Sequence, residues 1–401
     1  MKYFGLICLT ITLFFVACTS NPESQIKEIP TPAADNSFYP RLFTDNTGPV
    51  FMSWMEQDSG SLTKLKYAAF KGDTWSEPIE IAADSTWFVN WADYPAIIAR
   101  NGQPMAAHWL DKVDGGTYAY HIKMKAYSEV WSESFTPHTD NTPTEHGFVS
   151  MTPATDSSYM ALWLDGRQTL DREVDDYANM DKAMTLRAAS ISTTGDILED
   201  YLIDESVCDC CQTAIVNTEI GYAAAYRNRT PDEIRDIYTT TLINDVLSEP
   251  KAIHDDNWQI AACPVNGPAI DAHSNTVAVA WFTGANDEAL VKMAISQDHG
   301  RTYGEPVILD AQAPLGRVDL NMTDQSLWVS WLRPNKEDAE LVIRNYDLKG
   351  ELMEEYSLPG LSKDRSSGFP QITEYGDGLL VSYTDLSTSE PEVNTLLIES
   401  D

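Results

Sequence analysis

Basic residues are scarce in this sequence. It has 27 Lys and Arg against 61 Asp and Glu, which gives a formal net charge of −34 at pH 7. A surface of that sign repels nucleic acids and anionic lipids, so no nucleic-acid partner is expected. The acids are dispersed along the chain, as they are on an ordinary solvated surface. The charge therefore excludes one class of partner without marking a binding site.

Long apolar runs are also missing, with one exception at the N-terminus. Phe4–Val16 follows a single Lys2 and ends just before Cys18. This is the layout of an export signal, and it is too short for a mature membrane span. The segment resembles the lipobox of bacterial lipoproteins, which implies a signal peptide over residues 1–18 and acylation of Cys18. An ordinary cleaved signal with an incidental cysteine is the alternative.

The lipobox resemblance implies a place in the cell. Membrane lipid would be a partner through acylated Cys18, and no aspartate follows that cysteine to suggest inner-membrane retention. The expected location is the cell envelope, at an outer membrane or facing the periplasm. Residues 19–37, with three prolines and many polar residues, are expected to be a flexible tether to one domain over residues 38–401.

Long amphipathic helices are not evident, whereas aromatics, glycines and prolines are plentiful, as in chains of many short strands. A short apolar strand that ends in an aromatic residue occurs seven times, at intervals of 50 to 63 residues. Such a period predicts an all-β fold, a β-propeller with one four-stranded blade per repeat. The repeat aromatics are Trp54, Trp109, Trp163, Tyr226, Trp281, Trp331 and Tyr383.

The number of blades depends on the two ends of the repeat array. The seventh unit lacks an outer strand of its own, and the segment Ser24–Pro30 could supply that strand and close the ring. Seven blades are therefore favoured. Six blades, with the last unit completing the sixth or forming an appended hairpin, are the alternative.

The fifth unit contains a recognisable turn motif. Ser296–Tyr303 matches the Asp-box pattern S-x-D-x-G-x-T followed by an aromatic residue. Asp298 can bond to turn amides, Gly300 can adopt a positive φ and Tyr303 can fill the blade. With this motif the chain resembles the sialidase-like (BNR/Asp-box repeat) superfamily of β-propellers over nearly all of its mature length. The box, which includes Ser296, is a structural turn at the blade edge. The resemblance therefore supports a prediction of the fold more than a prediction of the activity.

The resemblance also implies where a sialidase would keep its catalytic groups. Such an enzyme has an arginine triad for the substrate carboxylate, a tyrosine nucleophile with a glutamate partner, and an aspartate acid/base; guanidinium groups suit a carboxylate because they bind it bidentately. No motif identifies the tyrosine. Ion pairs are the alternative role for each arginine. The candidates are Arg41, Arg235 and Arg317 for the triad, and Asp93, Asp111 and Asp165 as acids.

Cysteines are few after residue 18, yet they are concentrated. Cys208 and Cys263 each stand 18 residues before the repeat aromatic of their unit, so they hold equivalent positions in adjacent blades. Both precede an inner strand, which predicts a cluster on one face near the mouth of the central channel. The four mature cysteines are Cys208, Cys210, Cys211 and Cys263.

Two interpretations of the cluster remain open. In an exported protein four cysteines can pair as disulfides, and a Cys208–Cys263 bridge would join two blades. That pairing leaves Cys210 and Cys211, which could bond only through a strained vicinal ring. The alternative is a metal or redox site, in which C-x-C-C gathers three sulfurs, Cys263 adds a fourth and His254 lies nearby. Thiolates select Cu(I) or zinc.

Three functions follow from these observations. The first is a glycan-directed protein, either a divergent exo-glycosidase or a glycan-binding protein; an acidic surface disfavours capture of an anionic sialoside unless the channel is locally basic. The second is a thiol-dependent copper- or zinc-handling or redox protein. The third is a non-catalytic surface scaffold that binds envelope proteins.

Overall fold

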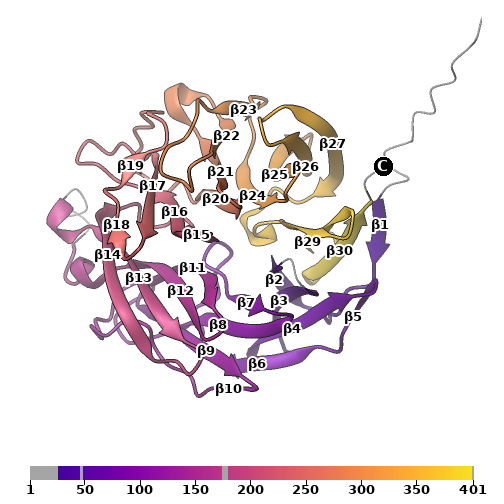
Figure 1. The fold of residues 1–401 in the computed structure, drawn as a ribbon. Helices are drawn as coiled ribbons and strands as arrows, with labels where there is room; N and C mark the ends of the chain where they lie inside the picture. The colour runs from indigo at the N-terminus through magenta and orange to yellow at the C-terminus, as the bar shows by residue number, and fades with distance from the viewer. Residues whose placement is uncertain (1–25, 46–47, 174–178, 400–401) are drawn as a thin grey trace, which may run out of the picture.

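Seven antiparallel sheets surround a central axis in the computed structural model, which describes residues 26–45, 48–173 and 179–399 (Figure 1). Each sheet is one blade, and its first strand in sequence lies nearest to the axis, except that the last blade also recruits β1. The favoured count of seven blades is confirmed, and the six-bladed alternative is wrong.

The first three blades contain β2 (Ser37–Phe43), β3 (Val50–Gln57), β4 (Thr63–Lys71), β5 (Thr74–Trp75) and β6 (Ile79–Asp84); β7 (Ala96–Arg100), β8 (Gln103–Lys112), β9 (Tyr120–Ser128) and β10 (Val130–Trp131); and β11 (His146–Thr155), β12 (Ser158–Asp165), β13 (Met184–Ser192) and β14 (Ile197–Val207).

The following three blades repeat this arrangement, and short 3-10 helices lie only in the connections. No helix in the described ranges is long and apolar enough to cross a membrane. The blades contain β15 (Ala214–Thr218), β16 (Gly221–Arg227), β17 (Ile237–Ile243), β18 (Val246–Leu247) and β19 (Lys251–Ala252); β20 (Ala269–His273), β21 (Thr276–Thr283), β22 (Leu290–Ser296) and β23 (Val307–Asp310); and β24 (Gly316–Met322), β25 (Ser326–Asn335), β26 (Asp338–Asp347) and β27 (Leu352–Leu361). The 3-10 helices are η2 (Arg167–Thr169), η4 (Met180–Lys182), η5 (Ala285–Asp287) and η6 (Arg365–Ser367).

The ring closes by pairing the two ends of the described chain. The seventh blade consists of β28 (Gln371–Tyr375), β29 (Gly378–Asp385), β30 (Glu392–Ile398) and β1 (Ile26–Ile29), in which β1 pairs antiparallel with β30. Thr395 Oγ1 donates to the carbonyl of Ile29 at 2.8 Å. β1 covers an edge that β30 would otherwise expose, as expected of the segment Ser24–Pro30. β1 falls within residues 19–37, the expected tether, and in the described structure it belongs to the seventh blade. Cys18 and the signal lie outside the described residues.

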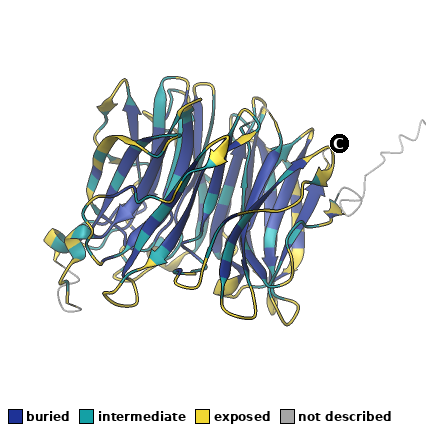
Figure 2. Ribbon diagram, turned by 90° about the horizontal axis from the view of Figure 1, so that it is seen from below, coloured by how far each residue is buried: buried dark blue, intermediate teal, exposed yellow. Residues whose placement is uncertain are grey.

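The repeat aromatics lie on the central strands, between neighbouring blades. Those strands are buried almost throughout because a blade covers each of their faces, while the loops at both rims are exposed (Figure 2). Each of the four fully buried repeat tryptophans donates its indole N–H to a carboxylate, because a buried donor needs a partner. The pairs are Trp54 with Glu56 (2.8 Å), Trp163 with Asp165 (3.0 Å), Trp281 with Asp256 (2.8 Å) and Trp331 with Asp310 (2.6 Å).

The turn between β22 and β23 has the contacts that its sequence predicts. Asp298 Oδ1 accepts from the backbone N–H of Thr302 at 2.9 Å, and Ser296 Oγ accepts from that of Gly300 at 2.9 Å. Gly300 has φ 84°, which a side chain would strain. Tyr303 packs among buried residues that blades four and five contribute. The motif thus stabilises a blade edge and lies outside the channel.

Candidate functional site

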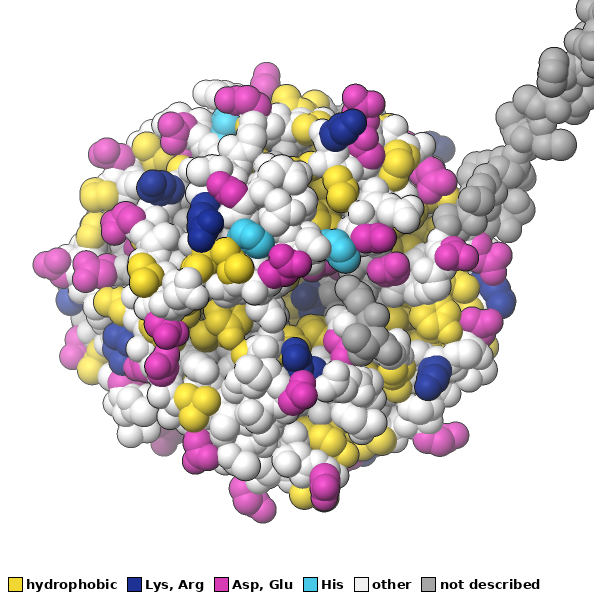
Figure 3. Space-filling model, viewed as in Figure 1, with side chains coloured by type: hydrophobic (Ala, Val, Ile, Leu, Met, Phe, Trp, Pro, Cys, Tyr) yellow, Lys and Arg dark blue, Asp and Glu magenta, His cyan; other side chains and the backbone are white. Residues whose placement is uncertain are grey.

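The inner strands surround a cavity on the propeller axis with a volume of about 390 Å³. Figure 3 shows the hollow at the centre of one face. Every blade contributes to its wall, because all seven inner strands run along the axis. The polar residues of the wall include Arg41, Asp93, Ser150, Thr152, Gln212, Asp271, Asp319, Asn321 and Gln371.

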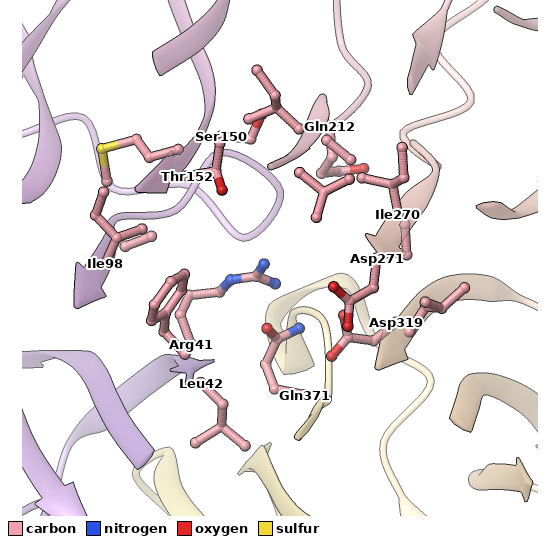
Figure 4. A pocket seen from close by; sticks show the side chains of 18 of the residues that line it. Arg41, Leu42, Ile98, Ser150, Thr152, Gln212, Ile270, Asp271, Asp319 and Gln371 are labelled. Atoms are coloured by element: carbon pink, nitrogen blue, oxygen red, sulfur yellow. The ribbon is translucent and has the colours of Figure 1, made fainter. Parts of the chain in front are cut away.

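Arg41 extends from β2 into this cavity, with Asp271 and Asp319 on the opposite wall (Figure 4). Its Nη1 donates to Tyr94 Oη at 3.3 Å, and its guanidinium lies 4.6 Å from the centre of the Tyr94 ring. Burial raises the pKa of Asp319 to about 6 and that of Asp271 to about 7, in spite of backbone amides that bond to both carboxylates. The cavity therefore has mixed charge and is not the basic channel that an anionic sugar would need.

Asp93 lies at the cavity wall but is only 2% exposed. Its carboxylate accepts from the backbone N–H of Phe148 at 2.7 Å and lies 2.8 Å from Tyr120 Oη, which is also 2.8 Å from Glu145 Oε1. A phenol has one proton, so one of the two carboxyl groups must supply a second. Burial raises the pKa of Asp93 to about 7 and that of Glu145 well above its usual range. The three groups thus form a hydrogen-bonded network behind the cavity wall.

The other two candidate arginines do not line the cavity. Arg317 donates to Ser367 Oγ at 2.7 Å and to the carbonyl of Gly368 at 3.1 Å, so neighbouring loop groups occupy its guanidinium. Arg235 is bound to Glu233 and to the sulfur of Cys208. The predicted triad is therefore not gathered, because only Arg41 of the three points into the cavity.

The two remaining acid candidates have structural partners. Asp165 is fully buried, and it accepts from Trp163 and pairs with Arg167 at 2.7 Å. Asp111 accepts from Thr86 Oγ1 at 2.8 Å. Neither lines the cavity, so Asp93 is the one candidate acid that does.

The cysteines converge where the inner strands of blades four and five begin. Cys208 Sγ lies 3.4 Å from Cys211 Sγ and 3.9 Å from Cys210 Sγ, and Cys210 hydrogen-bonds to Cys263. All four are free, so the disulfide alternative is not formed in the described chain. His254 lies outside the group and bonds instead to Asp256 at 2.9 Å. We call Cys208, Cys210, Cys211 and Cys263 the cysteine cluster.

The surroundings of the cysteine cluster favour one thiolate. Burial raises the pKa of Cys208, but hydrogen bonds from Cys210 and Cys211 and the charge of Arg235 lower it more, to well below its usual range. Arg235 Nη1 lies 3.3 Å from Cys208 Sγ. Donation to Cys208 raises the pKa of Cys210 well above its usual range, and burial raises that of Cys211 to about 12. Cys208 Sγ thus has two thiol groups and a guanidinium around it, which favour its thiolate over those of Cys210 and Cys211.

Arg227 connects the two cysteine-bearing loops, a role that sequence reasoning missed. Its backbone carbonyl accepts from the N–H of Cys208 at 3.0 Å, and its Nη2 donates to the carbonyl of Asn266, in the Cys263 loop, at 2.8 Å. Further guanidinium bonds reach the carbonyls of Phe282 (2.8 Å) and Arg235 (2.6 Å). The sequence signal for this role was the position of Arg227 directly after a repeat aromatic. A charged residue at the end of such a strand is ordinarily solvated, so the position did not indicate a buried contact.

Gln212, next to Cys211, spans the end of the cavity. Its Nε2 donates to the carbonyl of Ala92 at 2.7 Å, and its Oε1 accepts from the backbone N–H of Gly267 at 2.9 Å. The cysteine cluster is therefore attached both to the cavity wall and to the neighbouring blades.

The chain is similar to several solved structures at low sequence identity. No family model and no curated protein matches the chain. Solved structures do: the phage phi92 endosialidase (9% identity, 94% of this chain and 69% of that one, TM-score 0.48) and a variant of NanB sialidase from Streptococcus pneumoniae (14%, 96% and 71%, TM-score 0.44). The β-propeller domain of the Trilobed protease from Pyrococcus furiosus is similar to the same degree (9%, 90% and 95%, TM-score 0.47). The fold is a seven-bladed β-propeller, and similarities of this size transfer no activity to this chain.

Proposed function

We propose that this protein binds a thiophilic metal ion, Cu(I) or zinc, through the cysteine cluster. The sulfur separations of 3.4 and 3.9 Å carry the proposal. A disulfide would require about 2.05 Å, whereas sulfurs about 2.3 Å from one tetrahedral ion lie about 3.8 Å apart. The three sulfurs of Cys208, Cys210 and Cys211 therefore have nearly the spacing of ligands of one ion.

Charge and access support an exchangeable site. Several thiolates around one ion leave net negative charge, which Arg235 beside Cys208 offsets. Cys208 and Cys211 are buried, whereas Cys263 is exposed. An ion could therefore enter and leave past Cys263, which is the property expected of a protein that transfers metal.

A location at the cell envelope is part of the proposal. The apolar run Phe4–Val16 and Cys18 support an exported protein held by a lipid anchor. Such an anchor would keep the metal site at a membrane surface, where envelope proteins could deliver or accept the ion.

The test combines a thiol count with a metal titration. Protein purified under anaerobic conditions should show four reactive thiols when it is denatured without metal, and should bind one Cu(I) per chain against a competing chromogenic chelator. Cys208→Ser should weaken Cu(I) binding by at least about 100-fold, because it removes the central sulfur. Cys263→Ser should weaken binding less, by about 10-fold, because three sulfurs remain. His254→Gln is the matched control, since His254 lies outside the cluster and bonds to Asp256.

Two results would count against the metal site. One is the recovery of fully oxidised, metal-free cysteines from protein that was never exposed to air. The other is a reduced protein that binds neither Cu(I) nor zinc while its thermal unfolding shows an intact fold. A reversible two-thiol oxidation without metal binding would instead support the redox form of the thiol function.

A glycan-directed channel is the second candidate, and Arg41 favours it. Its guanidinium points into a cavity whose walls also present Gln371, Ser150 and Thr152 (Figure 4). Such a mixture of donors and acceptors suits hydroxyl groups, and the carboxylate of Asp319 disfavours an anionic sugar. A neutral sugar, bound or cleaved by a divergent exo-glycosidase, is the ligand class that we infer.

Fluorogenic glycosides and immobilised glycans test this second candidate. Arg41→Ala should reduce turnover or binding by at least about 10-fold, because it removes a guanidinium that points into the cavity. Arg187→Ala is the control, since that side chain pairs with Asp200 on the outer strands of blade three. If the wild-type protein neither cleaves nor binds any glycan, the glycan-directed function is rejected. The function that then remains for the channel face is that of a non-catalytic scaffold for envelope proteins.

A further inference from the structure

Three of the seven histidines meet between blades two and three. His121 lies on β9, His138 lies in the loop before β11, and His146 is the first residue of β11. One ring nitrogen of each lies within 4.8 Å of those of the other two. The rings of His138 and His146 stack at 3.9 Å, and the His121 ring stands perpendicular to that of His146 at 5.3 Å. Neither the channel nor the cysteine cluster involves these residues.

Backbone carbonyls determine where two of the ring protons lie. His121 Nε2 lies 2.8 Å from the carbonyl of Thr142, and His146 Nδ1 lies 3.1 Å from that of Thr144. A carbonyl can only accept, so each of these nitrogens carries its proton. The nitrogens that remain for a metal ion are therefore Nδ1 of His121 and Nε2 of His146.

His138 also donates one ring N–H, in its case to a carboxylate. Its Nδ1 lies 3.2 Å from Asp140 Oδ1, so it donates there, while its Nε2 is buried without a partner in the described structure. The residue is only 4% exposed, and an unpaired buried nitrogen is costly. Histidines that bind metals usually donate their second N–H to a carbonyl or carboxylate in this way. All three rings thus have the partners of metal ligands.

Anionic oxygens complete the set. His146 Nε2 lies 3.1 Å from Asp140 Oδ2 and 3.7 Å from Asp165 Oδ1. A carboxylate can only accept, so in this structure a proton on Nε2 stands between the ring and Asp140, at the place where a bound metal ion would replace it. Arg167 pairs with Asp165 at 2.7 Å and lies 3.4 Å from Asp140, so it offsets part of the charge from outside the cluster.

We propose that His121, His138 and His146, with Asp140, form a binding site for a divalent transition-metal ion such as Zn²⁺, separate from the cysteine cluster. Three imidazoles and one oxygen are a ligand set that zinc accepts. Binding turns at least one of the stacked rings, because an ion lies in the plane of the imidazole that holds it. The ion would join β9 to β11 and so tie blade two to blade three.

A cysteine-free protein isolates this site from the cysteine cluster. In mature chain with all four cysteines changed to Ser, calorimetric titration with ZnCl₂ should show one equivalent bound, and zinc should raise the Tm. His138→Gln in the same background should weaken binding by at least about 100-fold. His254→Gln is the matched control and should leave binding unchanged, since His254 bonds only to Asp256 among the described contacts.

X-ray absorption provides a second measurement that needs no cysteine variant. Wild-type protein loaded with excess zinc should show Zn–N and Zn–O distances of about 2.0 Å at this site, distinguishable from Zn–S at about 2.3 Å. Absence of a nitrogen and oxygen shell in the wild type would overturn the proposal. Unchanged zinc binding in the His138→Gln variant would also overturn it. The same holds for a cysteine-free protein that folds but binds no zinc, since a proton on His146 would then hold the cluster together.

Discussion

Replacing Arg227 by Met should lower the free energy of unfolding by about 3–5 kcal/mol and weaken metal binding at the cysteine cluster. The side chain is 2% exposed and donates to the carbonyls of Asn266, Phe282 and Arg235. Methionine fills a similar volume but removes the donor from three carbonyls, one buried and two partly buried. Because Asn266 belongs to the Cys263 loop, that loop loses one of its attachments to blade four and keeps the bond from Gly267 to Gln212.

Urea denaturation and Cu(I) titration measure the two effects of Arg227→Met. Arg227→Lys should recover only part of the stability, since one ammonium cannot reach three carbonyls as the guanidinium does. Arg187→Met is the control for loss of an arginine and should change stability by less than about 1 kcal/mol, because its partner Asp200 is solvent-exposed. A variant that matches the wild type in stability would show that Arg227 does not hold the two loops together.

Gly267→Ala should have the second large effect, through a steric clash between the two cysteine-bearing loops. A Cβ at this position would lie 2.2 Å from the backbone oxygen of Gln212 and 2.7 Å from its Cβ. The oxygen belongs to backbone beside Cys211, so it cannot swing aside as a flexible side chain would. We expect a loss of about 1–3 kcal/mol or more in the free energy of unfolding, and Cu(I) binding at least about 10-fold weaker.

Thermal unfolding and the same Cu(I) titration provide the measurements for Gly267→Ala. Gly304→Ala is the matched control, because the nearest atom to its added Cβ is the Ile295 oxygen at an ordinary 3.7 Å. If Gly267→Ala binds Cu(I) as tightly as the wild type, the position of the Cys263 loop does not matter for the metal, and the site consists of Cys208, Cys210 and Cys211 alone.

The propeller could be predicted because its signal is local and repeated. Neighbouring blades cover both faces of each central strand. The sequence of the strand is therefore an apolar run that ends in an aromatic residue such as Trp281, and this run occurs once per blade. The closing strand was predictable for a related reason, since the seventh unit lacks an outer strand of its own, and Ile26–Ile29 supplies one by pairing with β30. The same register placed Cys208 and Cys263 before neighbouring inner strands, so their convergence followed from the repeat.

The groups that the repeat does not position could not be predicted. Arg317 follows the start of an inner strand as a substrate-binding arginine would, but its guanidinium is bound by Ser367 and Gly368, 50 and 51 residues away in the chain. The Asp93–Tyr120–Glu145 network likewise joins residues from different blades, and nothing in their local sequence marks them as partners.

By itself, the sequence determined the propeller architecture, favoured seven blades over six and predicted the gathering of the cysteines, because burial on both faces of a strand imposes a pattern along the chain. Only the tertiary structure decided which charged and titratable side chains meet. It placed Arg41 alone of three arginines in the channel and brought His121, His138 and His146 together. Such contacts depend on the direction of each side chain and on the residues of the neighbouring blade. Neither of these produces a periodic pattern in the sequence.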